Sequence, residues 1–269
     1  MTSPETCGIQ NHRRSVPNVL APLDRLAQSS SSLWGKPVGT FAVNDQWYPL
    51  PRFLFNGPRG GDDPWRLGLF AAIHGDEPEG THALVRLVQS LVESPDLAKD
   101  YSLFIYPVCN PTGFEDNSRL SRNGHDLNRE FWRNSTSPEV QLLEKDILSH
   151  DFHGIIALHT DHTSPGCYGF VRGSILTKCL LEPALTAASH ILPRNFEPLI
   201  DGYRAHRSII KHGSDGVLGA PSWVRPRPFE IILETPQHAP QYLQEKALLV
   251  AVLSILAEYR KLVAYSPNL

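Results

Sequence analysis

Three residues in the first two thirds of the chain have the types and spacing needed to bind a metal ion. In the segment His74-Gly-Asp-Glu77, an imidazole and a carboxylate stand three residues apart and can face a common point. His159 could supply a third ligand from a neighbouring loop. Two histidines and one glutamate, with a fourth position open for water, form a known ligand set of catalytic zinc sites. The three residues therefore predict a catalytic site with one zinc ion per chain.

Each of these signals also has an ordinary structural interpretation. An isolated H-x-x-E pattern occurs by chance in many proteins. A histidine that follows an apolar strand, as His159 does, is more often a hydrogen-bonded structural residue. Glu77 could simply be an acid favoured at a helix N-terminus by the helix dipole. The metal hypothesis therefore depends on further signals that place these side chains in one site.

The elements that must position these residues are short apolar runs that alternate with longer helical patterns. Buried strands are expected at residues 67–73, 103–108, 154–158 and 229–233, and helices at 78–92, 138–148 and 240–263. This order is typical of an α/β protein with a mixed, largely parallel central sheet that is flanked by helices on both faces.

Polar residues follow all four expected strands. They are, in chain order, His74, Asn110-Pro111, His159 and Glu234. In open α/β sheets, ligands bind outside the carboxyl ends of the strands, where loops from separate strands converge. The four strand ends therefore indicate a single site.

The N-terminal part of the chain has a different composition. Residues 1–45 contain several prolines and a run of four serines at 29–32, which predicts a loop-rich arm. No internal repeat or long linker follows. Because 269 residues with 41% hydrophobic content lie near the upper limit of one domain, we expect a single catalytic domain at residues 46–269.

Charge and apolar patterning exclude several classes of protein. Lys and Arg number 25 against 28 Asp and Glu, for a net charge of -3, so there is no basic excess to neutralise a nucleic acid. The longest apolar stretch, residues 247–257, is too short to span a bilayer, and the N-terminus lacks the pattern of a secretory signal. The four cysteines form no C-x-x-C pair. We expect a cytoplasmic protein without nucleic-acid or membrane partners.

The segment between His74 and His159 adds further motifs. It contains Asn110-Pro-Thr-Gly113, then Arg119 and Arg122, and then Asp126-Leu-Asn128-Arg129. Together with H-x-x-E, a later histidine and a late glutamate, these residues resemble the zinc carboxypeptidase family in order and spacing. The resemblance covers about three-fifths of the chain, from His74 to Glu234. It implies the family's fold and a zinc-dependent hydrolysis of amide bonds.

The resemblance implies a role for each matching residue. His74, Glu77 and His159 would bind zinc, and Glu234 would be the general base that takes a proton from water and returns it to the leaving amine. Glu230 competes with Glu234, because it lies four residues earlier on the same face of the strand. We prefer Glu234 for its position at the strand end and its Glu-Thr-Pro context.

The resemblance also implies residues that contact substrate. An arginine would stabilise the anionic intermediate, and Arg119 is preferred over Arg122 for this role. Asn128 and Arg129 would bind the terminal carboxylate of the substrate. The digestive members of the family carry an arginine where this chain has Asp76, so that contact is not transferred. Tyr203 is the nearest match to their substrate-capping tyrosine, although a ring packed in the core is the preferred interpretation.

Three hypotheses about function follow. The first is a metallocarboxypeptidase-like hydrolase of a small peptide with a free carboxylate, for example one derived from the cell wall. The second is an N-acyl amino acid deacylase of the succinylglutamate desuccinylase/aspartoacylase type, whose members add a β-rich domain after the catalytic glutamate. Only 35 residues follow Glu234 here, which favours the first. The third is a binding protein without activity, and the complete set of ligands and base argues against it.

Overall fold

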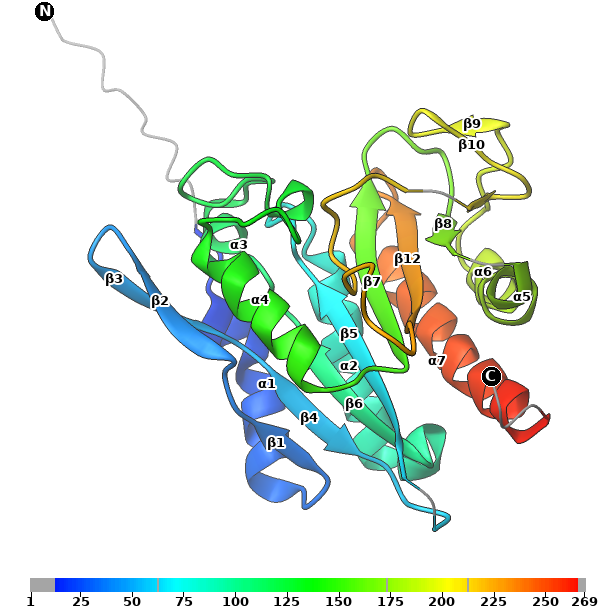
Figure 1. The fold of residues 1–269 in the computed structure, drawn as a ribbon, viewed down its shortest axis with the longest axis horizontal. Helices are drawn as coiled ribbons and strands as arrows, with labels where there is room; N and C mark the ends of the chain where they lie inside the picture. The colour runs from blue at the N-terminus through cyan, green and yellow to red at the C-terminus, as the bar shows by residue number, and fades with distance from the viewer. Residues whose placement is uncertain (1–12, 62, 173, 212, 266–269) are drawn as a thin grey trace, which may run out of the picture.

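The computed structural model describes residues 13–61, 63–172, 174–211 and 213–265. An eight-stranded sheet forms the centre of this part of the chain, in the order β1-β4-β6-β5-β7-β12-β8-β11 (Figure 1). In that order the strands are Leu33–Gly35, Phe53–Asn56, Tyr101–Tyr106, Trp65–Ala71, Gly154–Asp161, Phe229–Pro236, Tyr168–Val171 and Ile209–Ile210. Two further hairpins lie outside the sheet: β2 (Gly39–Val43) with β3 (Gln46–Leu50), and β9 (Leu199–Ile200) with β10 (Tyr203–Arg204).

Helices cover both faces of the sheet (Figure 1). The helices on one face, whose apolar side chains share a core with the sheet, are α1 (Val16–Ser29), α2 (Glu79–Glu93), α6 (Glu182–Ser189) and α7 (Gln241–Tyr265). On the other face, α4 (Pro138–Ser149) packs against Phe70, Tyr106 and Ile155. Shorter helical segments are Pro95–Ala98, α3 (Pro111–Asp116), Leu127–Arg129, α5 (Ser174–Leu176) and Thr177–Leu181. Within the described residues, no helix combines the length and apolar character that a membrane span requires.

The sheet is parallel where the site is expected. β6, β5, β7 and β12 pair in parallel, and antiparallel strands flank them on both sides. The side chains of the central strands alternate between the two cores, because successive residues of a strand point to opposite faces. The carboxyl ends of β5, β7 and β12 therefore lie at one edge. The expected α/β fold, with a mixed and mostly parallel sheet between helices, is confirmed.

Two of the expected strands extend further than their apolar runs. β7 and β12 pair over eight residues, from Gly154 with Phe229 to Asp161 with Pro236. His159 and Glu234 therefore lie within the last residues of their strands rather than after them. Because the same register pairs Glu234 with His159, the sheet itself places these two residues side by side.

The prediction of a loop-rich arm at residues 1–45 is wrong for its described part. Ser15 caps α1 by accepting a hydrogen bond from the main-chain N–H of Asn18, and Pro17 lies in the first turn, where proline is well tolerated. Leu20 and Leu23 of this helix are buried in the core. The hairpin of β2 and β3 then crosses the expected boundary at residue 45. Residues 1–12 lie outside the described part.

Candidate active site

The loop that carries His74 and Glu77 joins β5 to α2, and distant segments hold it in place. Its carbonyl oxygens accept hydrogen bonds from the loop before α3, from the residues before α1 and from the loop after β12. The pairs are Asn110 N to Ala72 O (2.9 Å), Arg14 Nη1 to Gly75 O (2.9 Å) and Gln237 Nε2 to Asp76 O (3.4 Å). Gly75 also lies so close to Gly113 that an added Cβ would be 1.9 Å from its carbonyl carbon. The loop therefore has one tightly determined position.

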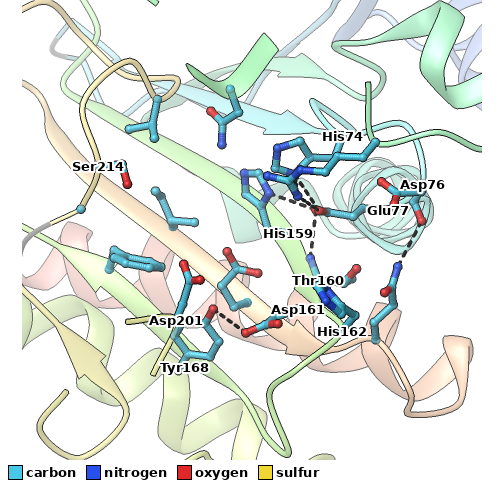
Figure 2. Close-up of a pocket in the computed structure, with 18 of the residues that line it drawn as sticks. His74, Asp76, Glu77, His159, Thr160, Asp161, His162, Tyr168, Asp201 and Ser214 are labelled. Carbon is cyan, nitrogen blue, oxygen red and sulfur yellow. Dashed lines mark hydrogen bonds and ion pairs between the residues drawn. The ribbon is translucent and has the colours of Figure 1, made fainter. Parts of the chain in front are cut away.

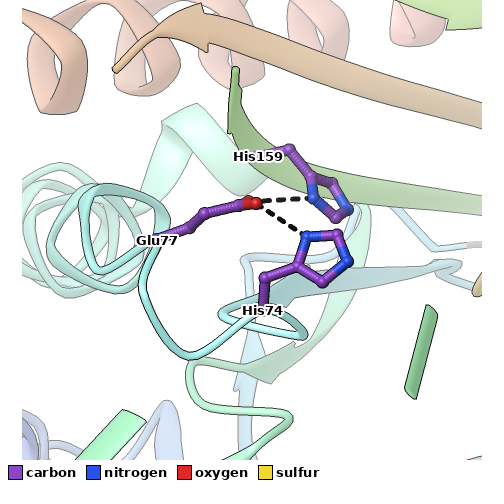
Figure 3. A group of neighbouring side chains, drawn as sticks. All are labelled: His74, Glu77 and His159. Carbon is purple, nitrogen blue, oxygen red and sulfur yellow. Dashed lines mark hydrogen bonds and ion pairs between the residues drawn. The ribbon is translucent and has the colours of Figure 1, made fainter. Parts of the chain in front are cut away.

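The three predicted metal ligands meet at one point (Figure 3). Potential ligand atoms of His74, Glu77 and His159 all lie within 4.8 Å of one another, and the three side chains are buried. Nδ1 of His74 is 2.6 Å from one carboxylate oxygen of Glu77, and Nδ1 of His159 is 3.0 Å from the other. The donors that converge here, two imidazole nitrogens and one carboxylate, suit zinc in number and type. The residues therefore fit a metal ion.

Asp126 orients the first histidine. Its Oδ1 lies 3.3 Å from Nε2 of His74, so the outer nitrogen of the ring can donate to a carboxylate while Nδ1 faces Glu77. Such a carboxylate partner is typical of metal-bound histidines, because it fixes the ring and its tautomer. No role was expected for Asp126 from the sequence. Its place in the segment Asp126-Leu-Asn128-Arg129 was the signal that could have identified it.

The charges of the cluster hold its acid ionised. Burial alone would raise the pKa of Glu77, but His159 and His74 outweigh it and keep the pKa well below its usual range. Burial lowers the pKa of His159, in spite of the neighbouring Glu77. A carboxylate and a neutral imidazole are the protonation states in which these groups bind metals.

The three candidate ligands line a cavity of about 340 Å³ (Figure 2). Glu234 lines the same cavity. Its carboxylate forms no hydrogen bond or ion pair with the described residues. Burial raises its pKa well above the usual range, and the nearby charges of Glu77 and Asp161 add to the shift. A partly buried carboxylate without a fixed partner, beside a candidate metal site, has the position and environment of a proton acceptor.

Glu230, the alternative base, lies outside this cavity. Its carboxylate accepts the main-chain N–H of Ala220 at 3.1 Å and forms ion pairs with Arg227 (3.4 Å) and Arg172 (3.7 Å). It borders a separate small cavity instead.

The two candidate arginines also occupy different places. Arg119 lines the cavity, with Nη1 3.2 Å from Nδ1 of His74, and it binds Asp126 through Nε and Nη2. Arg122 instead binds Asp116 and the hydroxyl of Tyr48, away from the cavity. Arg119 is thus the arginine that can reach a group bound at the cluster.

Asn128 and Arg129 line the cavity as well. The main-chain N–H of Leu218 donates to Oδ1 of Asn128 at 2.8 Å, which leaves the amide nitrogen as a free donor. The exposed guanidinium of Arg129 donates to the carbonyl of Asn128 at 2.8 Å and forms no ion pair within the described chain. Both side chains are therefore available to an anionic group.

Two tyrosines also line the cavity. The hydroxyl of Tyr168 donates to Asp161 at 2.9 Å, as the dashed line between them shows (Figure 2). Tyr203 packs edge-on against Phe170, but its ring is only half buried and its hydroxyl bonds to Ser214 at the cavity. The interpretation of Tyr203 as a core tyrosine is therefore only partly correct.

Comparisons with known proteins concern the sequence and the fold of the whole chain. Residues 65–195 match the sequence model of the succinylglutamate desuccinylase/aspartoacylase catalytic domain. A candidate metallopeptidase from Shewanella baltica has a similar structure, with a TM-score of 0.75, 22% identity, and coverage of 90% of this chain and 92% of that one. The fold of this chain is zinc carboxypeptidase-like. The resemblance seen in the sequence is confirmed.

Two carboxypeptidases extend the structural comparison. The metallo-carboxypeptidase from Burkholderia cenocepacia has a TM-score of 0.73 at 17% identity, over 93% of this chain and 70% of that one. Carboxypeptidase A from Helicoverpa armigera has a TM-score of 0.70 at 15% identity, over 95% and 75%. At such identities the likeness shows the fold alone. No curated protein matches the sequence.

Proposed function

We propose that this protein is a zinc-dependent hydrolase that cleaves an amide bond next to a residue with a free carboxylate, in a small peptide. One observation carries the proposal: a single cavity is lined by the His74, Glu77 and His159 cluster, the unpaired Glu234, and Arg129. These are the groups that amide hydrolysis requires, namely a metal site, a proton acceptor and a cation for an anionic substrate group.

Each group has a distinct role in the proposed reaction. When bound, zinc polarises the scissile carbonyl and lowers the pKa of water. The carboxylate of Glu234 accepts a proton from the attacking water and then donates this proton to the leaving nitrogen. Arg119 stabilises the negative charge that develops on the carbonyl oxygen, because its guanidinium already lies against the cluster.

Asn128 and Arg129 would bind the free carboxylate of the substrate. A guanidinium can bind both oxygens of a carboxylate at once, which gives direction as well as energy. Asn128 would add the amide N–H that its bond to Leu218 leaves free.

Deacylation of an N-acyl amino acid is a second candidate function. The specific observation in its favour is the family match at residues 65–195, which contains every proposed site residue except Glu234. The metal site, the base and the carboxylate clamp would serve both reactions. The two functions differ in the group on the acyl side of the amide.

The test is a hydrolysis assay of the zinc-loaded protein with dipeptides and N-acyl amino acids, each with a free or amidated carboxyl terminus. We expect turnover of the free acids, and chelation of the metal should abolish it. Preference for dipeptides would identify a peptidase, and preference for short acyl groups a deacylase. Cleavage of amidated and free substrates at equal rates would contradict both.

Arg129→Ala tests the carboxylate clamp directly. If Arg129 and the substrate carboxylate pair in a desolvated pocket, the variant should lose roughly 10- to 100-fold in kcat/KM for the free acid. The reason is that a charge-assisted hydrogen bond contributes about 1.5–3 kcal/mol. The variant should cleave free and amidated substrates at nearly equal rates, because it lacks the guanidinium that would bind the free carboxylate. Arg25→Ala, at an exposed position of α1, is the matched control. Additive losses from amidation and mutation would show that Arg129 does not bind the carboxylate.

A further inference from the structure

A second cavity, of about 600 Å³, adjoins the candidate active site and shares Tyr203 with it. Five basic side chains of the described residues line this second cavity, and they come from the helical segment before α6 and from the chain that runs from β10 to the residue after β11. They are Lys178, Arg204, His206, Arg207 and Lys211. None of the proposed catalytic groups lines it.

Few acidic groups of the described chain neutralise the basic side chains of the second cavity. Glu182 is the one acid among the described lining residues, and both of its carboxylate oxygens already bind the guanidinium of Arg194, at 3.0 and 3.2 Å. Arg207 reaches one of the same oxygens at 3.4 Å. Within the described chain, no ion pair or side-chain hydrogen bond engages Lys178, Arg204 or Lys211. The second cavity therefore has an excess of positive charge, although the net charge of the whole chain is -3.

The walls between these cations are apolar. Ile209 and Ile210 of β11, the edge strand beside β8, line the cavity and are themselves 5% and 1% exposed. The half-buried ring of Tyr203 and the side chain of Ala205 complete this wall. A cationic rim around an apolar wall complements a molecule that has both negative charge and an apolar body.

We propose that the second cavity is a binding site for a small organic dianion, a phosphate monoester or a dicarboxylate with an apolar body. The dianion relieves the repulsion among the unpaired cations, and guanidinium groups such as that of Arg204 can bind two oxygens of phosphate or carboxylate. The apolar body packs against Ile209 and Tyr203. Among the described lining residues, this site shares only Tyr203 with the candidate active site, and the proposal does not depend on the proposed hydrolysis.

Phenyl phosphate is the probe for this site, because it joins a dianion to an apolar ring. It is titrated into the full-length, zinc-loaded protein and followed by calorimetry and by NMR of the backbone amides. Benzene-1,3-dicarboxylate forms the second arm, which separates a phosphate site from a carboxylate site, and phenol is the uncharged control. We expect saturable binding of at least one dianion, with shifts confined to the second cavity, and no binding of phenol.

Variants locate the binding. The double substitution Arg204→Gln with Lys211→Gln should lower the affinity for the dianion at least tenfold, since it removes two of the unpaired cations. The matched control, Arg25→Gln with Lys246→Gln, changes the net charge equally at exposed positions and should bind as the wild type does. Arg129→Gln should also bind as the wild type, because it alters only the candidate active site. Absence of saturable binding, equal affinity in the Arg204 and Lys211 variant, or loss of binding in Arg129→Gln would overturn the proposal.

Discussion

Two clusters in this protein are built from the same residue types, yet they have different properties. One is the candidate active site, where histidines, carboxylates and Arg119 surround a cavity. The other lies on α4, where Asp146 accepts hydrogen bonds from Arg52 (2.7 and 2.9 Å) and Tyr106 (2.6 Å) and lies 3.2 Å from His150. Both clusters combine charged and aromatic groups at the edge of a hydrophobic core.

The difference lies in how completely the groups satisfy one another. At Asp146, burial would raise the pKa, but the bonds from His150 and Tyr106 and the charge of Arg52 outweigh it, so the pKa is lowered. At Glu234, burial and neighbouring acids raise the pKa, and no hydrogen bond within the described chain opposes the shift. A carboxylate whose acceptors are all occupied stabilises the fold, whereas one that faces a cavity without a partner can accept a proton. The following predictions test this distinction.

The largest effect is expected for Glu234→Gln. The amide is nearly isosteric but cannot accept the proton of water, so kcat should fall about 10²- to 10⁴-fold while zinc content and stability are kept. The measurement is steady-state kinetics with elemental analysis of the same sample. Glu230→Gln is the matched control, since its carboxylate binds Arg227 and Ala220 instead. A near wild-type kcat for Glu234→Gln, or an equal loss for Glu230→Gln, would move the base elsewhere.

His159→Ala should have the next largest effect, on the metal. Removal of one of three protein ligands should weaken zinc binding by more than about 100-fold, because even outer partners of a ligand contribute 10- to 100-fold. Chelator competition measures the affinity. His162→Ala is the control, because His162 lines the same cavity but lies outside the cluster. Unchanged zinc affinity in His159→Ala would exclude it as a ligand.

The central fold was predictable because its strands are buried on both faces and therefore appear as continuous apolar runs. The short strands at one end of the sheet carry no such signal: the edge strand β11 has two residues, and its neighbour β8 has four and depends on its pairing with β12. The helix α1 was missed because its prolines and the serines that follow it look like loop residues. Their effect depends on position, since Pro17 lies in the first turn and the serines begin only at the end of the helix.

The candidate site likewise has residues that the sequence predicted and supporting contacts that it did not predict. Strand ends and short motifs indicated the metal cluster and Glu234. The supporting contacts join residues far apart in the chain, 52 residues for Asp126 with His74 and 161 for Gln237 with Asp76, so no local pattern predicts them. The choice between Arg119 and Arg122 likewise depended on which guanidinium Asp116 binds.

Asp146→Asn tests the other side of the comparison and should lower stability rather than activity. Loss of the charge that binds Arg52 should reduce the free energy of unfolding by about 2–3 kcal/mol near neutral pH. Because the folded pKa of Asp146 is lowered, its stabilisation is complete above the unfolded pKa of about 4 and is lost as pH falls through the folded pKa. Urea unfolding of both proteins at neutral and acidic pH measures the difference. A gap that persists at low pH would contradict the charge mechanism.

The smallest effect concerns Arg14, which we predict to position the metal loop from outside the cavity. Its guanidinium donates to the carbonyl of Gly75 at 2.9 Å and lies 5.5 Å from the centre of the Phe114 ring. Arg14→Met keeps the apolar contact but cannot donate a hydrogen bond. The loop between His74 and Glu77 therefore loses one of the hydrogen bonds that hold it in place. We expect zinc affinity to fall roughly tenfold, the lower limit for supporting contacts of a metal site.

Arg13 provides the matched control for this test. It is adjacent in the chain, its side chain is 66% exposed, and its one ion pair, with Asp116 at 3.3 Å, does not reach the loop. Arg13→Met should therefore bind zinc as the wild type does, and Arg14→Lys should recover part of the affinity because its ammonium can donate one hydrogen bond. Zinc competition with a chelator, together with thermal unfolding of the metal-free protein, separates a weakened loop from a weakened fold. If Arg14→Met lowered the melting temperature but left zinc affinity unchanged, Arg14 would belong with Asp146 among the residues that stabilise the fold, and the candidate site would be positioned without it.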